Sequence, residues 1–501
     1  DFIEFIENYQ EDESYSYQRN LNGSLFFSGF YKSVVNYGHH LLRLKMQEDE
    51  IFQRILSDFE EQLMMRLRDI SIRVLIVEMH DYDSGGYLKG RDSKEKYEYF
   101  CKAIAAKKSY IQRVFERFPV LCRCIKETVE NTVDFYTDIM NWFHADKQAI
   151  QQRLCGGESV NYIQRIKGGF SDVHNKGRYV VRVLLDNGIE IICKPRSMET
   201  EKRYSEMLKW LAGETQIDQY EYEILSYPDH SWCAIVEYAS CGSEKELGYY
   251  YERLGVQLFL TYLLGTKDLH CENIIASGEY PVLIDLETLT NIRYNRSRTT
   301  ANDEICYRLS QSVLYTGMLP FYHWNRDGKG VDSSMISGAE GQRYPFKVPV
   351  VVKGGSSDMR IEYRHPESSR NQNLATVKGE FQEPVLYVEN IKSGYRSAYY
   401  AVLRKKDEFY RLLRKSEGLF CRYLTADTQH YSMVLSGSYH PSLLMDGAER
   451  EIFVYSMWKG RKERDKEIVD SEVRALLGGD IPYFYYAMNS KDLVDNCGRT
   501  V

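Results

Sequence analysis

A pair of β-rich runs around an Asn-Gly turn constrains the fold of this chain more than any other feature. Residues 178–185 and 189–194 are rich in Val, Ile and Leu and flank Asn187-Gly188. Such a pair between β-rich runs predicts a hairpin, because the tight turn needs residues that tolerate a positive φ. Pro195 ends the second strand, and helical periodicity follows over 199–211. The sequence therefore predicts a hairpin that ends on a lysine and leads into a helix.

The chain around this hairpin divides into regions that differ in hydrophobic periodicity and composition. Helical periodicity runs through the first 150 residues and recurs at 248–264, 394–435 and 470–477. A short buried strand is expected at 281–285, with a carboxylate at its end. The stretch 291–385 is irregular and rich in Gly and Ser, which predicts a small insert or a mobile flap. We expect a helical N-terminal region (1–155), a β-rich lobe (156–245), catalytic and metal loops (246–300), an irregular insert (301–390) and a helical part of the larger lobe (391–501).

The composition argues against several classes of function. Lys and Arg number 65 against 72 Asp and Glu, and the net charge of -7 leaves no general positive field to hold nucleic acid. No apolar run approaches the roughly 18 residues of a membrane-spanning helix. The 11 cysteines are scattered and form no CxxC pair, which favours a reducing, cytoplasmic setting over a disulfide or zinc framework.

The segment after residue 264 carries the residues of a phosphoryl-transfer site. Asp268 and Asn273 stand five positions apart, the spacing of the catalytic-loop Asp and Asn in kinases. Asp285 follows at the end of the short strand, where a kinase places its metal-holding Asp. Mg²⁺ takes oxygen ligands and few protein carboxylates, which Asn273 and Asp285 could supply. Lys194, between a strand and a helix, is placed like the lysine that contacts nucleotide phosphates.

Each of these residues alone has an ordinary explanation. A single Asp at a strand end is more often a cap or a surface charge than a ligand. The loop at Gly168-Gly169 lacks the GxGxxG pattern, and no Walker A sequence is present, which argues against a P-loop enzyme. The joint arrangement of lysine, catalytic loop and strand-end Asp favours a kinase-like site over coincidence.

Several further blocks make the sequence resemble the dehydratase domain of class II lanthipeptide synthetases, the LanM family. The blocks are Ser171-Asp172-Val173-His174 with Gly177-Arg178, Cys193-Lys194-Pro195-Arg196-Ser197, 268–276, 283–288, Arg422-Tyr423-Leu424 with Thr428-Gln429 and Tyr431, His440-Pro441, Arg450-Glu451 and Gly479-Asp480-Ile481-Pro482-Tyr483. They extend from about residue 168 to 483, and their common order makes the match specific. The first 150 residues match only in being helical.

The resemblance implies an α+β fold with a lipid-kinase-like, two-lobed core: a small β-rich lobe and a larger helical lobe. It also implies an enzyme that uses ATP and Mg²⁺ to phosphorylate Ser and Thr of a ribosomal precursor peptide. The same enzyme then eliminates the phosphate, which leaves dehydroalanine or dehydrobutyrine. The expected partners are the precursor peptide and a cyclase, either attached or separate.

The resemblance also assigns roles to residues. Asp268, His270, Asn273, Asp285 and Glu287 are expected to serve phosphorylation, with Asn273 and Asp285 on the metal and Glu287 among the nucleotide-binding residues. Lys194 is expected to contact phosphate. The candidates for elimination are Asp172, His174, Arg178, Arg422 and Thr428, with Arg178 as a phosphate-binding cation. Arg offers a fixed fork for phosphate oxygens, and His or Asp can move a proton; which residue removes the Cα proton stays open.

The sequence departs from the family pattern in two places. Only Cys497 lies beyond the block at 479–483 and no Cys-His-Gly occurs, so we expect no cyclase within this chain. Ala375 stands where a Pro is expected after a similar Asn-Leu. Two alternatives share the kinase-like residues: a kinase of a peptide or small molecule without elimination, which leaves Arg422 and Thr428 without a role, and an inactive peptide-binding scaffold.

Overall fold

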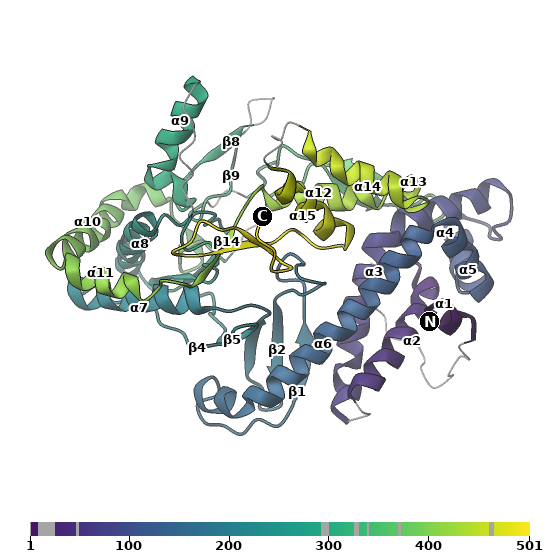
Figure 1. The fold of residues 1–501 in the computed structure, drawn as a ribbon, viewed down its shortest axis with the longest axis horizontal. Helices are drawn as coiled ribbons and strands as arrows, with labels where there is room; N and C mark the ends of the chain where they lie inside the picture. Colours follow the sequence, from purple (N-terminus) through teal and green to yellow (C-terminus); the bar gives the residue numbers. More distant parts are fainter. Residues whose placement is uncertain are drawn as a thin grey trace.

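A computed structural model describes residues 2–8, 26–46, 50–291, 300–324, 330–337, 340–368, 372–459 and 465–501. The N-terminal region is helical, as predicted, and forms the side of the molecule where the N-terminus lies (Figure 1). Its helices are α1 (Phe2–Asn8), α2 (Ser28–Met46), α3 (Glu50–Ser84), α4 (Ser93–Tyr99), the π-helix η1 (Phe100–Ala105), α5 (Lys108–Arg117) and α6 (Pro119–Arg153). Apolar residues spaced by three and four, such as Leu63, Leu67 and Ile70, bury one stripe of α3.

A five-stranded antiparallel sheet follows these helices, with the strand order β1-β2-β3-β5-β4. Its strands are β1 (Ile163–Lys167), β2 (Val181–Leu185), β3 (Glu190–Lys194), β4 (Ile224–Ser226) and β5 (Ser231–Ala234). The predicted hairpin is confirmed, because Val181 pairs with Cys193 and Gly188 has a φ of +86° in the turn. The buried faces of β1, β2 and β3 share one hydrophobic core with the N-terminal helices, so the sheet is anchored on α3 and α6.

A second hydrophobic core lies beside the sheet and holds mostly helices. It contains α7 (Glu199–Thr215), α8 (Glu244–Leu264), α10 (Val388–Arg404) and α11 (Lys406–Arg414). The hairpin of β6 (Ile274–Ser277) and β7 (Tyr280–Leu283) packs against α8. Helix α8 begins four residues before the predicted start, because the Ser243 side chain caps it, and it ends at Gly265 as expected. Strand β7 ends at Leu283, so Asp285 lies two residues beyond the strand.

The stretch 301–390 is more ordered than the predicted irregular insert. It contains α9 (Ala301–Ser310), the 3₁₀ turns η2 (Val313–Thr316) and η3 (Pro384–Tyr387), and three short hairpins. The hairpins pair β8 (Tyr322–Trp324) with β9 (Gly330–Asp332), β10 (Val348–Val352) with β11 (Arg360–Arg364), and β12 (Thr376–Val377) with β13 (Glu380–Phe381). The capping box of Thr300 and Asp303 starts α9, a local signal that the irregular composition concealed.

The C-terminal part contains a strand where only helical periodicity was expected. Between α11 and α12 (Thr428–Ser438), β14 (Phe420–Tyr423) pairs with β15 (Phe484–Ala487), which pairs with β16 (Val494–Asp495). The remaining helices are α13 (Pro441–Leu444), α14 (Gly447–Tyr455), the 3₁₀ turn η4 (Ser456–Trp458) and α15 (Lys466–Leu477). The prediction missed β14 because four residues are too short for a clear periodicity, and their partner strand lies about 60 residues further along the chain.

Helices α8 and α10 touch through their backbones at two glycines. A Cβ atom at Gly255 would lie 2.1 Å from the carbonyl oxygen of Ile391, and one at Gly394 would lie 1.8 Å from that of Glu252. We predict that Gly255→Ala lowers the free energy of unfolding by about 1–3 kcal/mol, since the helices must separate to admit the methyl group. Gly213→Ala in α7 is the control, because nothing lies within 4 Å of its added Cβ, and the change should raise stability by about 0.5–1 kcal/mol. Denaturant unfolding measures both; equal shifts would contradict the close packing.

Two further observations concern membrane-spanning helices and disulfide bonds. None of the helices in the described ranges combines the length and the apolar character needed to cross a bilayer. All eleven cysteines are free thiols in the structure.

Candidate active site

Lys194 ends β3 at the junction of the two cores and contacts the loop after β7. Its Nζ donates a hydrogen bond to the carbonyl oxygen of Ile284 at 2.7 Å and lies 3.9 Å from Oδ2 of Asp285. The side chain is only 8% exposed. The structure therefore brings together the lysine and the strand-end Asp, which the sequence separates by about ninety positions.

Arg196 and Glu201, which were not among the residues predicted for the site, complete this cluster. Arg196 donates from Nη2 to Oε1 of Glu201 at 2.7 Å and to Oδ1 of Asp285 at 2.8 Å. Glu201, in the first turn of α7, is buried and lies 4.0 Å from Nζ of Lys194. A glutamate in the first helix after the lysine strand was a usable signal, because kinases pair the two.

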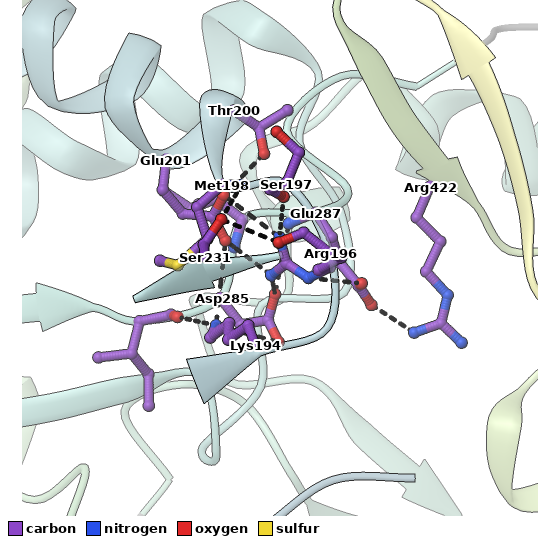
Figure 2. Close-up of polar contacts among 12 residues, drawn as sticks. Lys194, Arg196, Ser197, Met198, Thr200, Glu201, Ser231, Asp285, Glu287 and Arg422 are labelled. Atoms are coloured by element: carbon purple, nitrogen blue, oxygen red, sulfur yellow. Dashed lines mark hydrogen bonds and ion pairs between the residues drawn. The ribbon is translucent and has the colours of Figure 1, made fainter. Parts of the chain in front are cut away.

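Glu287 extends the cluster to Arg422. One carboxylate oxygen lies 3.3 Å from Nε of Arg196, and the other accepts a hydrogen bond from Nη1 of Arg422. Figure 2 shows the Glu287 carboxylate between these two guanidinium groups. The backbone is also joined here, since the N–H of Arg422 donates to the carbonyl oxygen of Glu287 at 2.7 Å. Strand β14, absent from the predicted fold, is thus what carries Arg422 into the site.

Arg422 has unused hydrogen-bonding capacity. Its guanidinium lies 4.9 Å from the ring centre of Tyr483, whose hydroxyl donates to Glu287 at 3.3 Å. Within the part of the chain that the structure describes, Nε and Nη2 of Arg422 are buried and have no hydrogen-bond partner. Buried donors without a partner are unfavourable, and a charged guanidinium is best satisfied by an oxyanion.

Asp268 holds a backbone conformation that is unusual for an aspartate. Its φ is +66°, in the left-handed region, and the Asn273 side chain stabilises this turn by donating to the carbonyl oxygen of Asp268 at 2.9 Å. Unfavourable backbone conformations of this kind concentrate at functional sites. The strained turn presents the Asp268 side chain to solvent, while Leu269 behind it is fully buried.

Asn273 and Asp285 come together at one end of the β6–β7 hairpin. The N–H of Ile284 donates to the carbonyl oxygen of Asn273 at 3.0 Å, so Asp285 is the next residue along. In the described residues no group of three or more His, Cys, Asp or Glu side chains could hold a metal. An amide oxygen and one carboxylate nevertheless fit Mg²⁺, which commonly takes the rest of its ligands from phosphates and water.

Hydrogen bonds to Asp480 and Ile481 hold the loop that carries Asp172 and His174 in place. The Asp480 carboxylate accepts hydrogen bonds from the N–H groups of Lys176 and Gly177 at 2.6 and 2.9 Å. The carbonyl oxygen of Ile481 accepts a hydrogen bond from Nδ1 of His174 at 2.8 Å. Since a carbonyl can only accept, Nδ1 carries the proton and Nε2 of the neutral ring keeps its lone pair.

The charges of the cluster shift the pKa values of its members. Burial alone would raise the pKa of Asp285, but Lys194 and Arg196 outweigh it and lower the pKa to about 2. Asp172 and Asp268 are exposed but lose part of their surrounding water to neighbouring groups, which raises the pKa of each, and in both cases the charge of Arg422 opposes the rise. Burial lowers the pKa of His270, but the neighbouring Cys271, Asp268 and Glu272 raise it to about 9. Asp172, Asp268 and Glu287 therefore all lie within electrostatic range of Arg422.

Two predicted site residues are engaged elsewhere. Arg178 pairs with Asp138 of α6 and donates to the carbonyl oxygen of Asn175, so it joins the loop to the N-terminal helices. Thr428 is the first residue of α12, which Asp427 caps. We call the connected residues Lys194, Arg196, Glu201, Asp285, Glu287 and Arg422 the Glu287 cluster. In the described residues, no hydrogen bond links Thr428 to this cluster. Ion pairs made directly or through Arg196 thus connect Lys194, Asp285, Glu287 and Arg422 of the predicted residues, whereas Arg178 and Thr428 are engaged elsewhere.

The His174 ring makes a testable contribution to stability. Burial and the charge of Arg422 lower the pKa of His174 to about 3 in the folded protein, against about 6.5 when unfolded. The unfolded chain binds the proton more readily between these values, so acidification through this window destabilises the fold by up to about 1.4 kcal/mol per pH unit from this group. We predict that the difference in unfolding free energy between the parent protein and His174→Gln shrinks from pH 7 to pH 5. Denaturant titrations at the two pH values test this, and a constant difference would contradict it.

The chain is similar to known proteins over most of its length. The model of a domain of unknown function, DUF4135, matches residues 118–487. The chain is also similar to the lacticin 481/lactococcin biosynthesis protein LcnDR2 of Lactococcus lactis subsp. lactis, with 24% identity over 466 residues. This alignment covers 88% of the chain and 48% of the relative, so the chain spans about half the length of the curated relative that it matches. The resemblance to LanM-type synthetases inferred from the motifs is confirmed by these matches.

Proposed function

This chain belongs to the DUF4135 family, and from that membership and the geometry of the site we propose that it dehydrates Ser and Thr residues of a ribosomal precursor peptide in lanthipeptide biosynthesis. The similarity to a lacticin 481/lactococcin biosynthesis protein supports the pathway. The proposed reaction has two steps, phosphorylation with ATP and elimination of the phosphate. A cyclase, attached or separate, is the proposed partner that uses the product.

The observation that carries this proposal is the position of Glu287 between Arg196 and Arg422. It joins the residues suited to phosphoryl transfer, Lys194 and Asp285, to an arginine that phosphoryl transfer does not need. A kinase without elimination leaves this arginine unexplained, together with its two donors that have no partner in the described residues. An enzyme that must also hold a departing phosphate gives those donors a ligand.

We assign the first step to Lys194 and Arg196 together with the two loops after α8. Asp268 would orient the peptide hydroxyl and accept its proton as oxygen attacks the terminal phosphoryl group. Lys194 and Arg196 would hold phosphate oxygens through their positive charge. Asn273 and Asp285 would hold Mg²⁺, which neutralises phosphate charge when bound. The pKa of Asp285, lowered to about 2, keeps that carboxylate ionised for this role.

We assign the second step to Arg422 and the loop at 172–174. A base removes the Cα proton, the electron pair forms the Cα–Cβ double bond, and the Cβ–O bond breaks as phosphate leaves. Arg422 would hold the departing phosphate. Asp172, through its raised pKa, and neutral His174, through the free lone pair of Nε2, are the two candidates for the base.

We also propose that the two hydrophobic cores correspond to two kinase-like lobes. The five-stranded antiparallel sheet, with Lys194 at the end of its central strand β3, would form the small lobe. Helices α8 and α10 with the β6–β7 hairpin would form the larger one. The eleven free thiols support a reducing compartment, which we take to be the cytoplasm.

A mass measurement tests the function directly. The protein is incubated with ATP, Mg²⁺ and the precursor peptide encoded beside its gene, and the peptide mass is followed over time. Loss of one water for each modified Ser or Thr supports the proposal. A stable gain of a phosphoryl group would instead indicate a kinase, and an unchanged peptide with every candidate precursor would contradict both.

A further inference from the structure

A cavity of about 280 Å³ lies on one side of Asp268, apart from the Glu287 cluster. Asp268, Leu269 and His270 form one wall, and residues of the insert form the other. The insert contributes mainly apolar side chains, namely Leu309, Leu314, Tyr315 and Phe321, with Ser333 and Ser334 beside them. Helix α9 and strands β8 and β9, which flank this part of the chain, lie along the upper edge of the molecule in the view of Figure 1.

The insert is fixed to the catalytic loop by backbone hydrogen bonds. The N–H of Leu269 donates to the carbonyl oxygen of Thr316 at 3.0 Å, and the N–H of Cys271 donates to that of Ser333 at 3.1 Å. Gly317 has a φ of +83°, and a Cβ there would lie 2.8 Å from the carbonyl oxygen of Leu269. The apolar wall is therefore held at a defined position beside Asp268.

The residues that line the cavity do not suit the binding of nucleotide phosphates. None of the ten lining residues is Lys or Arg. His270 is the one that can carry a positive charge, and the carboxylate of Asp268 beside it offsets that charge, so a polyanion gains little there. The cavity volume of about 280 Å³ is just below the usual range for ligand pockets, about 300–1,000 Å³. A single large apolar side chain suits the cavity better than a whole nucleotide.

We propose that this cavity binds the apolar side chain of a residue next to the acceptor Ser or Thr of the peptide. This inference rests on the proposed function, because it uses Asp268 as the group that meets the acceptor hydroxyl. Consecutive Cα atoms are about 3.8 Å apart, so a neighbour of the acceptor reaches the cavity while the hydroxyl stays at Asp268. Leu309 and Phe321 are 37% and 43% exposed, so part of their apolar surface is accessible to a peptide. Ser334, 5% exposed, has an Oγ without a partner in the described residues and is a candidate donor to the peptide backbone.

The test compares single-acceptor versions of the precursor peptide encoded beside the gene. One Ser is kept, and the residue next to it is Leu, Phe, Gly or Asp. With the parent protein we expect kcat/KM for the Leu and Phe peptides to exceed that for the Gly and Asp peptides by about 10-fold or more. Leu309→Ala and Phe321→Ala should each remove most of this preference and leave KM for ATP unchanged.

Ile305→Ala is the matched control, since Ile305 lies on the same helix, is 57% exposed and does not line the cavity. It should keep the full preference. An unchanged preference in Leu309→Ala and Phe321→Ala overturns the inference, as does a higher KM for ATP with an unchanged KM for peptide, which would place the adenine in the cavity. A parent protein that modifies none of the peptides overturns the proposed function itself, and the inference with it.

Discussion

Replacing Asp268 by Asn should lower the rate of peptide phosphorylation by about 10²–10⁴-fold, the usual range for a general base. Asn suits the test because it tolerates the left-handed backbone found at this position, where φ is +66°. The change therefore removes the proton acceptor and keeps the turn that Asn273 stabilises. Phosphoryl transfer is measured as single-turnover formation of the modified peptide, with the unfolding temperature as a check on the fold.

Glu272→Gln is the matched control for this variant. Glu272 stands on the same loop and its side chain is 75% exposed, so the change also neutralises a carboxylate near His270. It should change the rate by only a small factor. Equal losses in both variants would mean that the charge of the loop matters rather than the carboxylate of Asp268, and our assignment of the base would be wrong.

The second large effect is expected at Arg422. Arg422→Lys keeps the positive charge beside Glu287 but removes the planar fork, so phosphate release should slow by about 10²–10³-fold, as for the loss of an oxyanion-binding donor. Phosphorylation should continue, because Lys194, Asp268 and Asp285 are intact. The phosphopeptide should therefore accumulate and be seen by mass.

Two controls make the Arg422 result decisive. Supplying synthetic phosphopeptide to the variant isolates the second step, which should be slow there and fast in the parent. Arg474→Lys, in α15, changes an arginine that pairs with Asp495 away from the site and should leave both steps unaffected. If Arg422→Lys loses phosphorylation and elimination equally, our assignment of Arg196 to phosphorylation and of Arg422 to elimination is wrong.

The local parts of the fold were predictable from the sequence. The Asn187-Gly188 turn sets the hairpin that ends at Lys194, because the turn residues and the β-branched runs act over a few positions. Lys194 and Asp285 were expected to share a site, and they lie 3.9 Å apart. Helix α9 was not predicted, although its capping box is also a local signal, because the Gly-rich segments that follow it indicated an irregular stretch.

The parts that depend on distant pairing were not predictable in this way. Arg422 reaches Glu287 because β14 pairs with β15, and a four-residue strand has no periodicity of its own. Arg196 gains its importance from Glu201, which kinase-like pairing could have indicated, and from Asp285, which lies about ninety positions further along the chain and which no spacing reveals. Arg178 is the opposite case. It lies within a motif block and was expected in the site, but in the structure it pairs with Asp138 of α6.

The position of Glu287 has a consequence for synthesis on the ribosome. This carboxylate emerges about 135 residues before Arg422, the cation that covers its far side. Until β14 and β15 have both left the exit tunnel and paired, Glu287 has only Arg196 as a charged partner, and Tyr483 cannot yet close over it. The polar contacts of Glu287 can therefore be completed only after residues 484–487 have been synthesised and β15 has paired with β14.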